Sequence, residues 1–381
     1  MDWLLELGPG WHLQNRLWVA TEHAECRAIL ADHQRFLQWD GEPLLGMTAP
    51  PAGQITVQLP LSRRQPLSDI GPYCFAQTAV FLDGPEHGRF RRLLTKSWQT
   101  AAAAEGARLQ AAELADRLIS AAVSGGPFDF MADIAVPISA HTIATFFGDD
   151  PQPWVELSRH HPAIWGNDDP ATADRLVAEL QVRAWNLIAE RRANPRDDAF
   201  SRMAAGVGDA RLTDAEIATV ALQGGFASND GTILLLGGVA ESIAGNLAVQ
   251  SSLRDGHLSV SRLVTEVLAQ LPPLRGIFRR TETSFDWNGT VLPADTGVFV
   301  SIAAANSTLS GANSRSTPRH HLSYGSGVHV CPGAQVVTML GEVVAEALTA
   351  HGPVRLADPH PSRQWNGMFY GPRQLWIEAT E

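Results

Sequence analysis

The sequence predicts a mainly helical protein with a small β region, and three patterns support this. Apolar residues recur at helical spacing in several stretches of 103–205. A longer helical stretch begins at Leu212 and continues to about Val249. Short segments of strand character lie at residues 17–20 and within 278–300.

Composition excludes several classes of protein. Hydrophobic residues make up 45% of the chain and charged residues 18%, which is typical of a globular protein. The net charge of −11 argues against general nucleic-acid binding. The first six residues carry an early acid and no basic region, and no apolar run approaches the length of a membrane span. Three cysteines fit a reducing compartment. We expect one domain over residues 1–381, located in the cytoplasm and not at a membrane.

The N-terminal region predicts a strand, a helix and a long loop. Residues 17–20 form the expected strand, Thr21 is a candidate cap for the helix that follows, and Cys26 is expected in the core. Residues 40–80 are interrupted by many prolines and glycines, and so long a loop is usually functional. Its apolar residues favour a lid over an apolar pocket, and a plain surface loop is the alternative.

A charged helix is expected after Asp83. His87 and Arg91 are four residues apart and therefore share a face, where they could clamp a carboxylate or phosphate. An ordinary solvated face is the alternative. The remaining basic residues of this helix predict a patch for an acidic partner protein: Arg89, Arg92 and Lys96.

The middle of the chain predicts a series of helices over 101–124, 130–147, 151–166 and 172–193. Thr213 is a candidate cap for the long helix that follows. This helix contains glycines at 224, 225, 231, 237 and 238, each of which costs roughly 1 kcal/mol relative to alanine. We therefore expect another part of the chain or a ligand to approach its backbone closely, or the helix to open locally.

The C-terminal third predicts a small sheet, a buried helix and further strands. The sheet has a turn at Asn288–Gly289. Apolar residues recur at helical spacing over 336–348, and residues 352–381 resemble strand and loop. Residues 368–370 are candidates to reach a pocket.

One cysteine lies between a glycine-rich turn and this buried helix. A lone cysteine is usually a small buried hydrophobe or a reactive thiol. Gly325 and Gly327, however, permit close backbone approach to Cys331, and a helix starting near Gly333 adds its positive N-terminal end. These features favour a thiolate, which suits an axial ligand of haem iron.

The stretch from Tyr324 to Gly333 resembles the cysteine loop of the haem-thiolate oxygenases, the cytochrome P450 superfamily. That family reads aromatic-Gly-x-Gly-x-His-x-Cys-x-Gly, and the likeness extends more weakly from about residue 15 to the end. The resemblance implies a P450-like fold with haem b (iron protoporphyrin IX) between the long central helix and the cysteine-loop helix. It implies Cys331 as the iron ligand, with further cofactor contacts from Tyr324, Gly325, His329 and Gly333.

Other motifs of the family can be carried over residue by residue. His87 and Arg91 match a His-x-x-x-Arg pair that holds a haem propionate. Arg279 lies where the family places another propionate-binding arginine, although Arg280 or a plain surface charge are alternatives. Ala227 begins the central-helix motif Ala-Gly-x-acid-Thr-Thr.

Within this motif, Asp230 retains the acid and is the expected proton-relay group. Gly231 replaces the first threonine, and Thr232 retains the second. Since one residue turns about 100° around a regular helix, Thr232 would then face away from the haem. A distorted helix could bring its hydroxyl in.

The sequence also departs from the family in two places. Glu266 of the Glu-x-x-Arg motif is present, but Ala269 replaces the arginine, with Arg262 or Arg275 as possible substitutes. Residues 306–319 are short and serine-rich where the family has a longer acidic segment.

These observations lead to three hypotheses. The first is a monooxygenase of secondary metabolism that oxidises a small, largely apolar substrate with electrons from ferredoxin and ferredoxin reductase. The second is another haem-dependent reaction, such as coupling, cyclisation, dehydration, nitrene-type transfer or peroxide use, because of Gly231. The third is a non-catalytic protein that binds or recruits a partner.

Overall fold

The computed structural model describes residues 8–12, 17–38, 79–98, 101–164, 170–208, 210–309, 320–365 and 368–380. The predicted lid over residues 40–80, apart from its last two residues, lies outside this part of the chain, as do Cys74 and residues 310–319.

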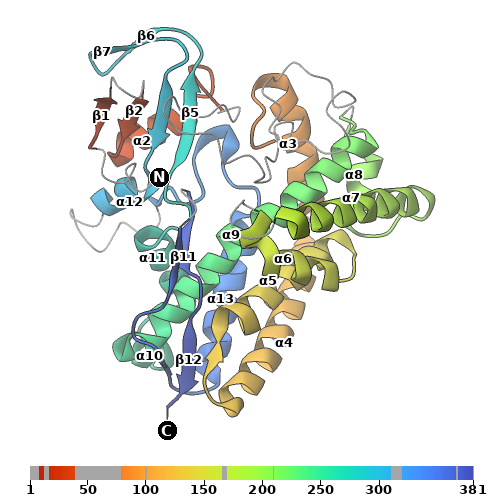
Figure 1. Cartoon of the computed structure of the whole chain (residues 1–381), viewed down its shortest axis with the longest axis vertical. Helices are drawn as coiled ribbons and strands as arrows, with labels where there is room; N and C mark the ends of the chain where they lie inside the picture. The colour runs from red at the N-terminus through yellow and green to blue at the C-terminus, as the bar shows by residue number, and fades with distance from the viewer. Residues whose placement is uncertain are drawn as a thin grey trace.

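Helices dominate the fold, as predicted (Figure 1). They are α2 (His23–Ala31), α3 (Gly84–Trp98), α4 (Ala101–Gly125), α5 (Val136–Phe147), α6 (Gln152–Ile164), α7 (Pro170–Ala193), α8 (Ala199–Ala205), α9 (Asp214–Ala244), α10 (Leu247–Arg254), α11 (Val260–Gln270), α12 (Ile302–Leu309) and α13 (Ala334–Ala350), with a π-helical turn η4 (Met131–Ala135) and a 3₁₀ turn η6 (Gly327–His329).

The central helix α9 begins at the predicted cap and ends earlier than predicted. Thr213 and Glu216 form a reciprocal capping box, with Thr213 N donating to Glu216 Oε2 at 2.7 Å. The helix ends at Ala244 because Asn246 starts a new one: its Oδ1 accepts the backbone N–H of Ala248 at 3.0 Å. The two helices α9 and α10 therefore meet at 93°.

The first helix begins differently from the prediction. Glu22, and not Thr21, is the N-cap residue of α2, and no side chain caps this helix end. Thr21 is one residue too early for its hydroxyl to reach the free N–H groups of the first turn. Cys26 is fully buried, as predicted.

The strands form one larger sheet and three small ones. The larger sheet has the order β1 (Gly10–His12), β2 (Leu17–Ala20), β8 (Gly297–Val300), β5 (Ile277–Thr281), β3 (Phe36–Gln38), and its β2–β8 pair is parallel. The small sheets pair β6 (Phe285–Trp287) with β7 (Thr290–Leu292), β10 (Arg363–Trp365) with β11 (Tyr370–Pro372), and β12 (Trp376–Ala379) with both β4 (Phe128–Asp129) and β9 (Val354–Leu356). The predicted turn at Asn288–Gly289 has positive φ at both residues, 52° and 78°.

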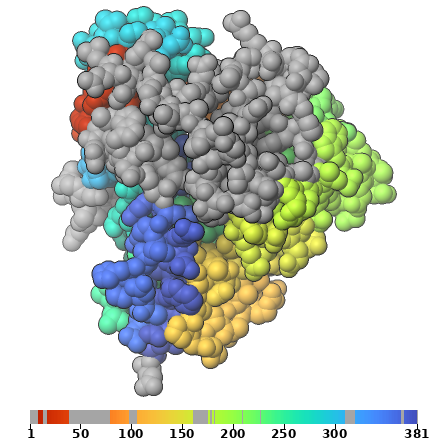
Figure 2. Space-filling view, viewed as in Figure 1, coloured from red at the N-terminus to blue at the C-terminus, as the bar shows by residue number. Residues whose placement is uncertain are grey.

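Two hydrophobic cores lie in different parts of the molecule. The larger core joins α9 to α4, α5, α11 and α13, while the smaller core lies between the larger sheet and α2. Figure 1 shows the sheet at the upper left and most helices to the right and below. Figure 2 shows that the C-terminal segment and α4 form much of the lower part of the same face.

Within the described residues, no single helix is long and apolar enough to cross a membrane; only α9 and α10 taken together meet that test of length and composition.

Candidate functional site

The cysteine loop owes its shape to two glycines. Gly325 and Gly327 have φ of 74° and 73°, in the left-handed region that favours glycine. Cys331 N donates to Tyr324 O at 2.8 Å and closes the loop. A Cβ on Gly327 would lie only 2.8 Å from Ala31 Cα, so this glycine lets the loop pack directly on α2.

Backbone amides surround the Cys331 sulfur. The N–H groups of Gly333 and Ala334, at the start of α13, donate to Sγ, and the Arg91 guanidinium adds positive charge nearby. Burial outweighs these influences and raises the pKa of the thiol. A metal ion deprotonates a coordinating thiol, and the same amides would then stabilise the bound thiolate.

Four nitrogen-bearing side chains gather around this loop, and we call them the donor cluster: His87, Arg91, Arg279 and His329. The rings of His87 and His329 lie 4.0 Å apart, centroid to centroid. Arg91 donates to the Val330 carbonyl. The cluster therefore joins α3, β5 and the cysteine loop, which are far apart in the sequence.

The donor cluster carries more positive than negative groups. Burial, the neighbouring His329 and Arg91 lower the pKa of His87 to about 4. Burial also lowers the pKa of Arg279 to about 10, against the attraction of Asp83. Asp83 Oδ1 lies 3.5 Å from His329 Nε2, and one carboxylate cannot balance two arginines.

The donor cluster therefore fits an anionic group. His87 Nε2 is buried and has no hydrogen-bond partner among the described residues. Two arginines and two histidines match the two propionate carboxylates of haem in charge and in donor chemistry.

The glycines of α9 serve different purposes. A Cβ on Gly225 would clash with the Trp154 ring of α6, and one on Gly237 would lie 2.6 Å from Met131 Sδ. At Gly231, by contrast, no atom of the described residues lies within 4 Å of such a Cβ. Close packing therefore explains Gly225 and Gly237, whereas Gly231 borders open space.

Thr232 is turned about 100° around α9 from Gly231 and so faces away from the open face. Ser158 of α6 donates to Asn229 Oδ1 at 2.5 Å, and Thr232 is one turn further along the same face and is buried. Ala227, one turn before Gly231, is exposed on the open face. The helix is α-helical throughout Asp214–Ala244, with no local opening.

Asp230 lies beside the open face. It follows Ala227 by three residues and is buried. Asp230 is the one acidic residue in the segment 227–232, directly before Gly231.

Comparisons of the whole chain with known proteins give a consistent result. No protein-family model matches the chain. Erythromycin C-12 hydroxylase of Saccharopolyspora erythraea is 25% identical over 410 residues, covering all of this chain and 94% of the hydroxylase. Nocardicin C N-oxygenase of Nocardia uniformis is 26% identical, covering 91% and 85%.

Solved structures show the same fold. The cytochrome P450 CYP109Q5 of Chondromyces apiculatus superimposes with a TM-score of 0.80 at 21% identity, covering the whole chain and 95% of that protein. In sequence and in fold, the chain is similar to cytochrome P450s over its whole length. Its relatives among P450s include hydroxylases and monooxygenases, so it is a P450-type oxidoreductase, and P450s carry haem.

The glutamate that remains of the Glu-x-x-Arg motif has an ion-pair partner within its own helix, α11 (Val260–Gln270). Arg262 Nε donates to Glu266 Oε1 at 2.5 Å, so Arg262 is the partner of this glutamate. Arg275 lies against Tyr370 instead.

A set of hydrogen bonds around Asn306 was not predicted from the sequence. The buried Asn306 of α12 accepts the N–H of Leu322 at 2.8 Å and donates to Ser323 Oγ at 3.0 Å. Ser323 Oγ in turn donates to the Leu268 carbonyl of α11 at 2.5 Å. These bonds tie α11 and α12 to the segment that leads into the cysteine loop. An asparagine and a serine in a polar stretch give no sequence signal for such a contact.

The predicted basic patch is smaller than expected. Arg89 pairs with Glu86 at 2.7 Å and with Glu216 at 2.5 Å, so it braces α3 against the start of α9. Arg92 and Lys96 are exposed.

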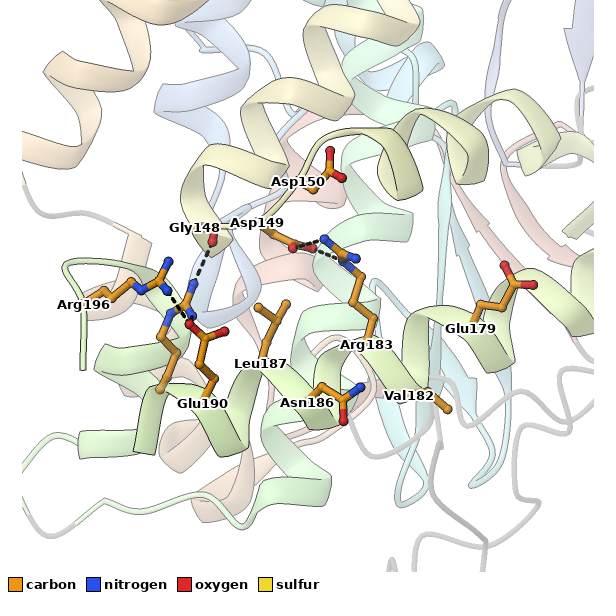
Figure 3. Close-up of a pocket in the computed structure, with 11 residues that line it drawn as sticks. Gly148, Asp149, Asp150, Glu179, Val182, Arg183, Asn186, Leu187, Glu190 and Arg196 are labelled. Carbon is orange, nitrogen blue, oxygen red and sulfur yellow. Dashed lines mark hydrogen bonds and ion pairs between the residues drawn. The ribbon is translucent and has the colours of Figure 1, made fainter. Parts of the chain in front are cut away.

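A cavity of about 470 Å³ lies elsewhere, between the α5–α6 connection and α7. Figure 3 shows its charged side chains turned toward one another, with Arg183 on Asp149 and Arg196 on Glu190. None of its lining residues belongs to the donor cluster or the cysteine loop.

Proposed function

We propose that this P450 is a haem b enzyme that oxidises a small, largely apolar, natural-product-type substrate with O2 and electrons from a ferredoxin and its reductase. The observation that carries this proposal is the convergence of Cys331 with the donor cluster. Haem b, when bound, supplies thiolate-ligated iron that can activate O2.

The protein's own residues supply binding, orientation and protons. Cys331 is the proposed iron ligand, and His87, Arg91, Arg279 and His329 are proposed to hold the propionates. Gly325 supplies the positive φ that the loop needs, Gly333 is proposed to lie against the cofactor, and Tyr324 is fixed by a 2.8 Å hydrogen bond to Thr338 Oγ1. Asp230 is proposed to pass protons, through water, to the open face at Ala227 and Gly231.

The substrate and partner classes rest on different observations. Several relatives act on macrolides according to their names, among them erythromycin C-12 hydroxylase and mycinamicin IV hydroxylase/epoxidase. Arg92 and Lys96, exposed on α3, would attract an acidic electron donor despite the net charge of −11.

The test is the visible spectrum of the reduced, carbon monoxide-bound protein. Wild-type protein and the Cys26→Ser and Cys74→Ser variants should show a thiolate-type Soret band, and Cys331→Ser should lose it. Haem-replete wild-type protein without that band, or a normal band in Cys331→Ser, would contradict the proposal.

A second candidate function follows from Gly231 and Thr232. With no hydroxyl on the open face at these positions, a haem reaction that avoids protonated O–O cleavage is the alternative, such as coupling or cyclisation. Peroxide use, one of these reactions, can be tested by replacing NADPH and the redox partners with hydrogen peroxide. A rate of product formation as high as with NADPH would favour peroxide use over monooxygenation.

A further inference from the structure

Arg275 is a half-buried arginine whose charge has no carboxylate partner in the described part of the chain. Its guanidinium carbon lies 5.5 Å from the centre of the Tyr370 ring, and its Nε is buried without a hydrogen-bond partner among those residues. Burial lowers the pKa of Arg275, and only Tyr370 opposes this effect. A buried cation of this kind is costly unless an anion pairs with it.

The backbone of Arg275 is held on both sides. Its N–H donates to Met368 O at 2.7 Å, and its carbonyl accepts the N–H of Ala303 at 3.0 Å. The adjacent Pro273 carbonyl accepts the N–H of Tyr370 at 2.9 Å. The guanidinium and the ring beneath it are therefore carried by a fixed pair of chain segments and not by a free loop.

This pair of segments borders the candidate active site. A Cβ on Gly371 would lie 2.9 Å from Leu234 of α9, and Leu234 is one turn beyond Gly231 on the same side of that helix. Arg279 of the donor cluster follows Arg275 by four residues, and β5 begins between them at Ile277. Arg275 is thus placed next to the open face of α9 and four residues before Arg279.

A second arginine on the same ring provides a contrast. The Arg363 guanidinium carbon lies 5.9 Å from the Tyr370 centroid, but it pairs with Glu241 at 2.8 Å. The charge of Arg363 is therefore balanced by Glu241, whereas Arg275 has no such carboxylate among the described residues.

We propose that Arg275 binds a carboxylate of the substrate, so that the substrate class is a largely apolar carboxylic acid. This inference rests on the proposed function. A planar guanidinium binds a carboxylate through two parallel hydrogen bonds, and its single charge matches one carboxylate. A phosphate dianion would have its second charge unbalanced, and the haem propionates already have the donor cluster.

The test measures binding of acid and ester pairs by isothermal titration calorimetry to the haem-loaded protein. The probes are dodecanoic acid with methyl dodecanoate, and 4-phenylbutanoic acid with its methyl ester. Wild-type protein should bind at least one acid about ten- to a hundredfold more tightly than its ester, the range for a hydrogen-bonded charge pair. Arg275→Gln should abolish this preference, Arg275→Lys should retain part of it, and Arg363→Gln should retain it fully.

Two results would overturn the inference: equal affinity for acid and ester in both pairs with wild-type protein, or an unchanged acid preference in Arg275→Gln. Loss of haem in Arg275→Gln without any acid preference in the wild type would instead assign the arginine to the cofactor, which also overturns it. The carbon monoxide spectrum, recorded on the same samples, separates the two proposals, because a missing thiolate band counts against the proposed function and not against the acid preference.

Discussion

Gly231 and Thr232 are neighbours in the sequence, but only one of them borders the open face of α9. Thr232 shares the side of Asn229, which bonds Ser158 of α6. A buried hydroxyl that is turned about 100° from Gly231 is poorly placed to deliver a proton to the open face.

We therefore expect Thr232→Ala to leave the product formed per NADPH consumed unchanged within about twofold, and Asp230→Asn to reduce it severalfold. Both ratios are measured with a reconstituted reductase system. If Thr232→Ala lowers product severalfold while NADPH consumption continues, Thr232 is the alcohol that delivers the proton.

The donor cluster leads to a prediction about cofactor retention. In the double variant His87→Ala and Arg91→Ala, an anionic propionate would lose two of its donors, which typically costs a few kcal/mol. The purified variant should contain much less haem than wild type, measured as the ratio of Soret absorbance to protein absorbance after gel filtration. Arg92→Ala, on the same helix but exposed, is the control and should retain its haem.

Within the helix α9, the glycines differ in how much room a side chain would have. A side chain at Gly225 meets Trp154, whereas one at Gly231 meets no described atom. Because glycine costs a helix about 1 kcal/mol relative to alanine, Gly231→Ala should raise the free energy of unfolding of the haem-free protein by up to about that amount. Gly225→Ala should lower it. Denaturant titration measures both, and a Gly231→Ala variant less stable than wild type would show that the open face is filled.

The hydrogen bonds of Asn306 and Ser323 link α11 and α12 to the segment that leads into the cysteine loop. Asn306→Ala removes the acceptor of Leu322 N–H and the donor to Ser323, and leaves buried polar groups unsatisfied at roughly 1–3 kcal/mol. We expect the variant to bind haem but to lose the thiolate-type carbon monoxide band faster on warming. The exposed Asn288, which already has φ of 52°, is a matched control as Asn288→Gly.

Local signals determined which elements the sequence could predict. The cap of α9 at Thr213 and the Asn-Gly turn are short-range patterns, and both predictions were confirmed. The end of α9 was placed too late because the apolar pattern continues past Ala244, while the break depends on a cap at Asn246. The contact of Asn306 with Ser323 depends on packing between distant segments and could not be predicted.

At the scale of the whole molecule, the donor cluster connects the two hydrophobic cores. Phe90 and Leu93 of α3 belong to the helical core, while Arg279 comes from the sheet that contributes to the other core. A bound group that pairs with both sides would couple their unfolding. The cysteine-loop motif predicted the fold, and separate family motifs named the other cluster residues, but no motif predicted this division of the core.

We therefore expect haem removal to separate the stabilities of the two cores. In haem-loaded protein, backbone amides of Leu17–Ala20 and of α9 should exchange with solvent at similar free energies of opening. In haem-free protein the strand should exchange first, measured by hydrogen–deuterium exchange with mass spectrometry. Equal protection of both regions without haem would indicate a single cooperative unit over 1–381 that does not depend on the cofactor.

The contact between Gly327 and α2 has a consequence for laboratory evolution of this enzyme. A side chain at residue 327 would meet backbone atoms of Leu30 and Ala31, which cannot move without moving the helix. At Gly325 the nearest atom to an added Cβ is 3.8 Å away, and only the positive φ is a constraint, which asparagine tolerates better than most residues. A library designed to tune the iron–sulfur bond should therefore vary residue 325, with asparagine included, and keep residue 327 constant.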